Sequence, residues 1–226
     1  MPGMPLLASL YPDPPYEYRG SRLVTAAVTG SLRPGVLPDG LDMAPDPMIT
    51  VVFADYPDTT IGPYREAIVL VGCSYRGTVG LYCPFIYVDS DAALAAGREV
   101  WGFPKKFADI ELDATGSTVR GRLSRLGSAL LVLDGDAPEP TDPAVAGAAA
   151  ALPIYNHKVV PGVAAREPDV DCLTEVRLEM TGREAWLGSG TLRTGGEVAQ
   201  VLGEAGPVQL IRAVVDSVLP AGGRLG

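Results

Sequence analysis

Short apolar, β-branched runs separated by glycine, proline and charged residues recur along the whole chain, a pattern typical of strands and turns. Glu66–Tyr75 carries Ala-Ile-Val-Leu-Val in its middle, which indicates a long strand. Phe107–Leu112 alternates apolar and acidic side chains, as a half-buried strand does. Arg76-Gly77-Thr78-Val79-Gly80 has the chemistry of a hairpin turn. The predicted strands are Leu23–Val28, Met48–Ala54, Glu66–Tyr75, Leu81–Val88, Phe107–Leu112, Thr118–Leu123, Ala129–Leu133, Leu173–Met180 and Val208–Val218, the last of which also suits a helix.

Helix signals are few. Asp89-Ser90-Asp91 can cap a helix over Ala92–Glu99, and the alanine-rich segment Thr141–Leu152 begins with Thr-Asp-Pro, a plausible helix start. No internal repeat or clean linker is visible, although Pro138–Pro143 is the best candidate for a surface connection. We therefore expect a single domain over residues 1–226, mostly β (α+β), with its antiparallel strands in a barrel or closed sheet.

Composition and charge narrow the classes of function. Of the 226 residues 47% are hydrophobic, which is enough for a sizeable core, and the net charge is −9. Because no basic stripe is present to meet phosphates, we expect no nucleic-acid partner. No apolar run reaches the ~20 residues of a membrane span, and Met1–Leu10 lacks the features of a signal peptide. The acidic balance fits a soluble cytoplasmic protein.

Several familiar kinds of site can be set aside. The three cysteines, Cys73, Cys83 and Cys172, are odd in number and form no Cys-x-x-Cys motif, so we expect free thiols and no metal site. With His157 as the single histidine, a Ser-His-Asp triad is hard to build, and we expect an ordinary loop or strand residue there. Gly188-Ser189-Gly190 lacks the spacing of a nucleophile elbow, so a tight turn is expected.

Amine chemistry remains. Lys105 and Lys106 follow Pro104 at the end of an apolar, aromatic segment. Apolar surroundings and a second ammonium both disfavour the charged form of an amine, and a neutral amine is a nucleophile. An adjacent lysine pair is more often simply a solvated surface, so the residues alone leave both interpretations open. The apolar walls would come from Trp101, Phe103 and Phe107.

The segment 97–107, Gly-Arg-Glu-Val-Trp-Gly-Phe-Pro-Lys-Lys-Phe, resembles the signature of the acetoacetate decarboxylase superfamily. Acetoacetate decarboxylase is itself the standard example of a lysine activated by a neighbouring cation. The preceding residues 87–95 also resemble the family, in which a strand ends in an acidic turn and enters a short helix. Weaker similarity covers nearly the whole chain: Leu37-Pro38 with Gly40-Leu41, Pro153–Tyr155, Lys158–Pro161, Glu175–Leu178, Glu184–Trp186 and Val215–Pro220.

The resemblance implies roles for individual residues. Lys105 would be the Schiff-base lysine and Lys106 its charged neighbour. Gly62-Pro63-Tyr64-Arg65-Glu66 is similar to the family's Gly-x-Tyr-x-Glu, so Glu66 would be the active-site glutamate rather than a residue facing water. The family's N-terminal arginine would be Arg22 or Arg19, and the alignment leaves both open.

One departure concerns the second glutamate that the family's decarboxylases place after a phenylalanine on an early strand. Here Phe53 is followed by Ala54. A carboxylate there would repel the substrate's own carboxylate and help expel carbon dioxide, so its loss weakens the decarboxylase interpretation. It also removes bulk, which predicts a larger pocket. The expected substrate-binding residues are Arg22, Arg19, Phe53, Ala54, Trp101 and Phe103.

The leading hypothesis is a cofactor-free lyase in which Lys105 forms a Schiff base with a small carbonyl or oxo-acid substrate. Decarboxylation, slightly ahead on the intact lysine pair, and aldol-dehydration both fit. One alternative is a natural-product tailoring cyclase that uses the pocket without imine chemistry. Another is a non-catalytic ligand-binding member of the fold. The resemblance also implies an antiparallel sheet around a cone-like β-barrel, few helices, a buried pocket and a homo-oligomer.

Overall fold

One fifteen-stranded sheet organises the molecule in the computed structural model, which describes residues 9–28, 33, 35–44, 47–164, 166–203 and 206–225. Its strand order is β15-β12-β11-β6-β5-β3-β1-β14-β13-β10-β9-β8, with β2, β4 and β7 paired beside this path. The strands are β1 (Tyr16–Val28), β2 (Leu41–Met43), β3 (Ile49–Tyr56), β4 (Asp58–Thr59), β5 (Tyr64–Tyr75), β6 (Thr78–Val88), β7 (Lys105–Phe107), β8 (Asp109–Asp113), β9 (Thr118–Arg125), β10 (Ser128–Thr141), β11 (Ile154–Pro161), β12 (Pro168–Val176), β13 (Glu179–Thr194), β14 (Pro207–Leu219) and β15 (Gly223–Arg224).

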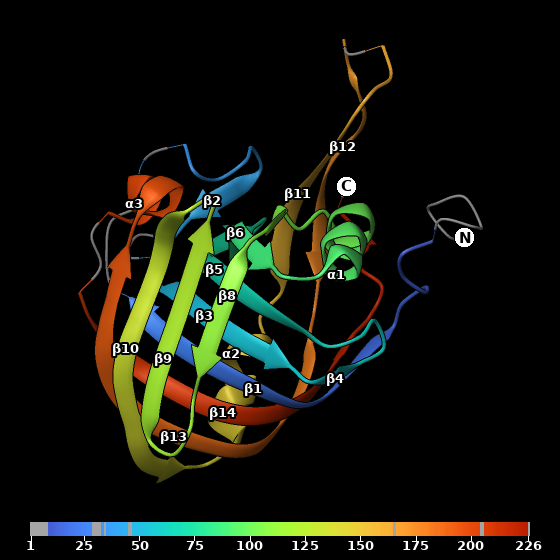
Figure 1. Cartoon of the computed structure of the whole chain (residues 1–226). Coiled ribbons are helices and arrows are strands. Elements are labelled where there is room, and N and C mark those ends of the chain that lie inside the picture. The colour runs from blue at the N-terminus through green and yellow to red at the C-terminus, as the bar shows by residue number, and fades with distance from the viewer. Residues whose placement is uncertain are drawn as a thin grey trace.

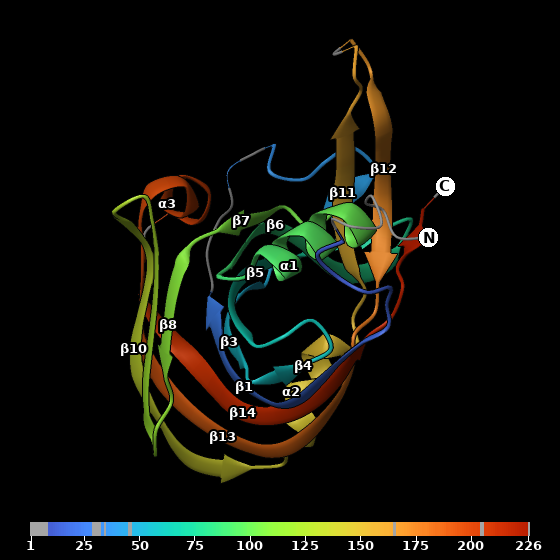
Figure 2. The same cartoon turned by 45° about the vertical axis from the view of Figure 1, so that its right-hand side comes forward.

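The predicted fold class is confirmed, because strands dominate and helices are few. The described helices are α1 (Asp91–Ala96), α2 (Ala144–Ala150) and α3 (Gly196–Leu202), with a π-helical turn η1 (Gly97–Trp101) directly after α1. The sheet curls strongly from β10 through β13, β14 and β1 to β3 (Figures 1 and 2). Among the described residues its pairing path ends at β15 and β8 without returning on itself, so the expected full closure was wrong.

Pairing is antiparallel except where β6 meets β7 and β11. The hairpin turn that the sequence predicts is confirmed: β5 and β6 are joined at Arg76 and Gly77, whose φ angles of 47° and 82° are those of a type I′ turn. Val208–Val218, which suited either structure, is strand β14. The β11–β12 hairpin projects beyond the rest of the fold (Figures 1 and 2).

Some local predictions were wrong because long-range pairing decides them. Leu173–Met180 is divided between β12 and β13, which pair with β11 and β14 in different halves of the sheet. Pro138–Pro143 lies partly within β10, where a register shift between Asp136 and Glu139 tolerates prolines. Gly188–Gly190 lies inside β13 rather than in a turn, and a Cβ on Gly188 would lie 1.9 Å from the Asp136 carbonyl oxygen.

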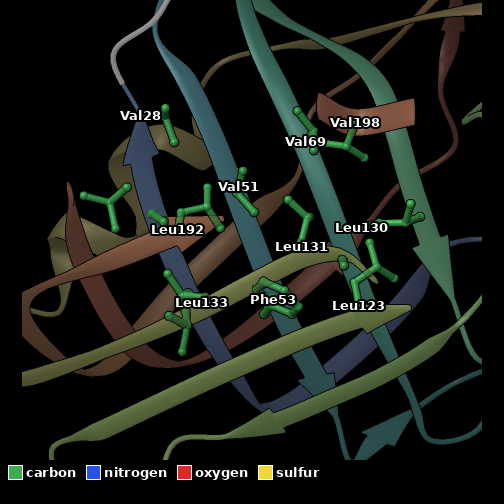
Figure 3. Close-up of a cluster of buried hydrophobic side chains, with 14 of the residues drawn as sticks. Val28, Val51, Phe53, Val69, Leu123, Leu130, Leu131, Leu133, Leu192 and Val198 are labelled. Carbon is green, nitrogen blue, oxygen red and sulfur yellow. The ribbon is translucent and has the colours of Figure 1, made fainter. Parts of the chain in front are cut away.

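The main hydrophobic core lies on the face of β1, β3 and β5 that meets β9, β10 and β13. Phe53 is fully buried in it, and Figure 3 shows its ring among Val51, Leu123 and Leu133. Gly121 provides the space, because a Cβ there would lie 2.8 Å from the Phe53 ring. Within the described part of the chain, no helix has the length and apolar character to cross a membrane.

The burial of Phe53 generates a stability prediction. We expect Phe53→Ala to lower the free energy of unfolding by about 3–5 kcal/mol, because a large cavity remains in a packed core. Phe107→Ala is the matched control: Phe107 is 53% exposed, so its loss should cost within about 0.5 kcal/mol. Urea unfolding of the two variants checks this, and equal losses would contradict the assignment of Phe53 to the core.

Candidate active site

The segment that leads to Lys105 is built by turns that the sequence encodes locally. Ser90 caps α1 by accepting a hydrogen bond from the Ala93 amide, and η1 follows without a break. Gly102 ends η1 in the left-handed region with φ 74°, where a side chain would also meet Lys158. After Phe103 and Pro104 the chain enters β7, which runs parallel to β6.

Gly97 has a direct steric role at Lys105. A Cβ at residue 97 would lie 2.5 Å from the Cδ and Cε atoms of Lys105, so only glycine lets the lysine stem pass this close to η1. Arg98 also holds this segment in place, because it donates a hydrogen bond to the Lys105 carbonyl at 3.1 Å. Gly97 and Arg98 of the sequence motif therefore position Lys105, which lies eight and seven residues after them.

Lys105 and Glu66 form a buried ion pair. The lysine Nζ lies 2.6 Å from the glutamate Oε2, and the two side chains are 7% and 6% exposed. Glu66 comes from β5, next to Val88 of β6, and Lys105 comes from β7 on the other edge of β6. The Nζ also lies 5.6 Å from the centre of the Tyr64 ring and 5.9 Å from that of Phe103. An amine and a carboxylate thus share an apolar, largely dehydrated site.

A small cavity of about 70 Å³ adjoins this pair. A volume of this size holds a few water molecules or a small organic molecule. Among the described residues that line it, Glu66 is the only carboxylate and Lys105 the only cation. The lining residues are Tyr18, Tyr56, Tyr64, Glu66, Ile68, Ile86, Phe103, Lys105, Ile154, Leu178, Ser217 and Leu219.

Three tyrosines add hydroxyl groups to the cavity wall. Tyr56 donates a hydrogen bond to Glu66 Oε1 at 3.4 Å, and the Tyr64 hydroxyl lies 3.3 Å from that of Tyr18. Burial, and then the negative charge of Glu66, raises the pKa of Tyr56 and of Tyr64 well above the usual range. Burial likewise raises the pKa of Tyr18. All three phenols therefore stay protonated at neutral pH and serve as hydrogen-bond donors.

Lys106 lies on the opposite face of β7, because successive side chains of a strand point to opposite faces. Its Nζ contacts Glu197 of α3 at 2.6 Å, and Tyr87 donates to the other oxygen of the same carboxylate, also at 2.6 Å. Burial alone would raise the pKa of Glu197, but these two hydrogen bonds and the positive charges of Lys106 and Arg125 together more than offset it, and the pKa is lowered. Lys106 is absent from the cavity lining, so the geometry does not support its expected role as the charged neighbour of the nucleophile.

Neither candidate arginine reaches the cavity. Arg19 pairs with Glu17 at 2.6 Å and Arg22 pairs with Asp55, and both arginine side chains are more than half exposed. The physical reason is a register shift in β1 around Gly20, whose φ is 60°. The extra residues let Arg19 and Arg22, three positions apart, both point outward.

Of the four apolar residues predicted to bind substrate, Phe103 alone lines the cavity. Phe53 belongs to the core on the other face of β3. Trp101 is buried, and its Nε1 donates a hydrogen bond to the Pro220 carbonyl at 2.9 Å. Ala54 lies opposite Glu66 in the β3–β5 register, but it packs with Leu23, Ala185 and other apolar residues and does not line the cavity.

The sequence pointed less clearly to the tyrosines and to Cys83. Tyr64 belongs to the Gly-x-Tyr-x-Glu motif, and Tyr56 lies two residues after Ala54 on the same strand face, so strand periodicity could have found both. Cys83 is fully buried close enough to Glu66 and Lys105 to feel both charges, and burial raises the pKa of its thiol. Cys73, Cys83 and Cys172 are free, as expected, and His157 lies in β11 paired with Asp171. The described residues contain no cluster of three or more groups suited to a metal ion.

Comparison with known proteins gives a consistent result. Residues 5–216 match the family model described as acetoacetate decarboxylase (ADC). Acetoacetate decarboxylase 3 of Mesorhizobium japonicum is 30% identical over 194 residues, which cover 84% of this chain and 75% of that protein. The crystal structure of acetoacetate decarboxylase from Legionella pneumophila superposes with a TM-score of 0.90 at 25% identity, covering 99% of this chain and 92% of that one. The enduracididine biosynthesis enzyme MppR complexed with pyruvate gives 0.79 at 20% identity, with 97% and 93% covered.

The two lysine–glutamate pairs differ in burial, and breaking them should therefore lower the free energy of unfolding by different amounts. We expect Glu66→Gln to destabilise the protein by about 3–5 kcal/mol, because an unpaired buried ammonium remains. Glu197→Gln breaks a pair whose side chains are 36% and 38% exposed, and should cost under about 1 kcal/mol. Denaturant unfolding at neutral pH compares the two variants. A larger loss for Glu197→Gln would contradict this ranking.

Proposed function

The chain belongs to the acetoacetate decarboxylase family, and on that premise we propose that it is a lyase in which Lys105 forms a Schiff base with a small oxo acid. The observation that carries the proposal is the buried contact of 2.6 Å between Lys105 and Glu66 beside a small cavity lined by aromatic side chains. A nucleophilic amine needs to lose its proton, and a carboxylate in direct contact can take it. No cofactor is required, because the imine itself accepts electrons.

The proposed chemistry begins when the carbonyl group of the substrate enters the cavity. Lys105 first gives its ammonium proton to Glu66, and the neutral amine attacks the carbonyl carbon. One proton then moves from the nitrogen to the carbonyl oxygen to give the carbinolamine, and Glu66 returns its proton to the carbinolamine hydroxyl, which leaves as water and gives the protonated imine. A bond to the adjacent carbon can then break or form, because its electron pair is delocalised onto the imine nitrogen. Water finally releases the product and the free amine.

Two reactions fit this intermediate. Decarboxylation of a 3-oxo acid is supported by relatives named acetoacetate decarboxylase, among them those of Mesorhizobium japonicum and Chromobacterium violaceum. Aldol addition followed by loss of water is supported by Ala54, which leaves Glu66 as the single carboxylate, and by the similar fold of MppR complexed with the condensation product of pyruvate and imidazole 4-carboxaldehyde. In either case the cavity of about 70 Å³ favours small substrates over the bulky intermediate of a tailoring cyclase. Assembly as a homo-oligomer stays a prediction.

The imine is tested directly by borohydride reduction. With acetoacetate or pyruvate present, reduction should add the mass of the reduced substrate to Lys105 of the intact protein. Peptide mass mapping identifies the residue, and Lys105→Ala is the control that should carry no adduct. Absence of an adduct across several small oxo acids would contradict imine chemistry and favour a ligand-binding role.

The variant Lys106→Met tests whether Lys106 contributes to the reactivity of Lys105. Since Lys106 lies on the other face of β7 and contacts Glu197, we expect the variant to form the Lys105 adduct within about threefold of the wild-type rate, because an exposed pair contributes little. Mass spectrometry of the trapped adduct over time measures the rate. A loss of trapping of 100-fold or more, equal to about 2.7 kcal/mol, would restore the electrostatic role that the sequence suggests for Lys106.

A further inference from the structure

Tyr56 is the one β3 side chain in the cavity wall, and it completes a line of three polar groups. Lys105 Nζ contacts Oε2 of Glu66 at 2.6 Å, and the Tyr56 hydroxyl contacts Oε1 of the same carboxylate at 3.4 Å. We propose that Tyr56 is a further catalytic residue, which protonates the oxygen of an aldehyde when the enamine formed on Lys105 adds to it. This inference rests on the proposed Schiff-base function.

The ring of Tyr56 is held in place by its neighbours. Its centroid lies 4.9 Å from that of Tyr18 of β1 and 4.9 Å from that of Tyr64 of β5. Aromatic pairs at this distance restrict ring movement and contribute packing energy. The hydroxyl is thereby directed at Glu66, and a contact of this length in the free enzyme can shorten when substrate binds.

The protonation state of Tyr56 suits a donor. Burial and the adjacent Glu66 charge both disfavour a phenolate, so the hydroxyl keeps its proton until a stronger base appears beside it. The alkoxide formed by addition to an aldehyde is such a base. Decarboxylation creates no comparable oxyanion, because its electron pair moves into the imine. A wall of neutral phenols therefore fits carbon–carbon bond formation to an aldehyde.

The protons balance without an outside reagent. Glu66 removes a proton from the carbon next to the imine carbon, and the electrons of that C–H bond form the enamine. The enamine carbon bonds to the aldehyde carbon, the aldehyde π electrons move to oxygen, and this oxygen takes the proton of Tyr56. Glu66 then returns its proton to the Tyr56 phenolate through their contact. Both side chains end in their starting states.

Tyr56→Phe tests the role, with Tyr155→Phe as the matched control. Tyr155 lies outside the cavity and also donates one long hydrogen bond, to the Thr78 carbonyl at 3.3 Å. Each protein is given pyruvate and acetaldehyde. Three readouts are measured: the borohydride-trapped adduct on Lys105, deuterium exchange into the pyruvate methyl group in D2O, and the rate of condensation.

For Tyr56→Phe we expect adduct formation and deuterium exchange within about threefold of wild type, because Lys105 and Glu66 remain. Condensation should fall by about 100-fold or more, the usual contribution of a positioned acid. Tyr155→Phe should leave all three readouts unchanged. Condensation at the wild-type rate in Tyr56→Phe, or an equal loss in Tyr155→Phe, would overturn the role of Tyr56.

The same three readouts on the wild-type protein distinguish a failure of this inference from a failure of the proposed Schiff-base function. An adduct and deuterium exchange without condensation would overturn the role of Tyr56 and leave the Schiff-base function standing. No adduct with any oxo acid would overturn the Schiff-base function, and the role of Tyr56 with it.

Discussion

The ion pair between Lys105 and Glu66 is the constraint on which the rest of the site depends. Removing two charges from water costs several kcal/mol per ion, so the pair is sustained only where the surrounding fold holds it at short range. Both partners are anchored to β6, Glu66 through β5 and Lys105 through β7. Gly97 and Gly102 shape the approach to β7, because side chains at either position would collide with lysines. The glycines of the motif are thus as necessary to the geometry as the charged residues.

Because successive side chains of a strand point to opposite faces, the two faces of the sheet have different roles. On one face Phe53 and its neighbours form a dry core, which supplies the hydrophobic stabilisation. On the other face Glu66, Tyr56 and Tyr64 line the cavity. Lys106 falls on the core side of β7, where Glu197 of α3 neutralises it. The proposed nucleophile and the lysine next to it in sequence therefore lie on opposite faces of β7.

Much of the strand content could be predicted, because apolar runs and the Arg76-Gly77 turn are local signals. Contiguous motifs singled out Lys105 and Glu66, and the structure brings these two side chains together. The sequence could not give the direction of side chains whose orientation depends on distant pairing. A register shift turns Arg19 and Arg22 outward, and core packing removes Phe53 from the cavity. Gly188–Gly190 looks like a turn by composition, but close contact with β10 makes it part of a strand.

The sequence alone determined the mostly β class and the acidic character, since these follow from periodicity and residue type, and it pointed to the lysine and glutamate of the candidate site through motifs that resemble those of the family. Only the tertiary structure decided which side chains meet. It placed Lys105 against Glu66, with Lys106 on the other face of β7, and it brought Tyr56 to the same carboxylate. It also left a cavity of only about 70 Å³. The reason is that burial and contact depend on the register and curl of strands far apart in the chain, and a one-residue shift in register turns a side chain to the other face.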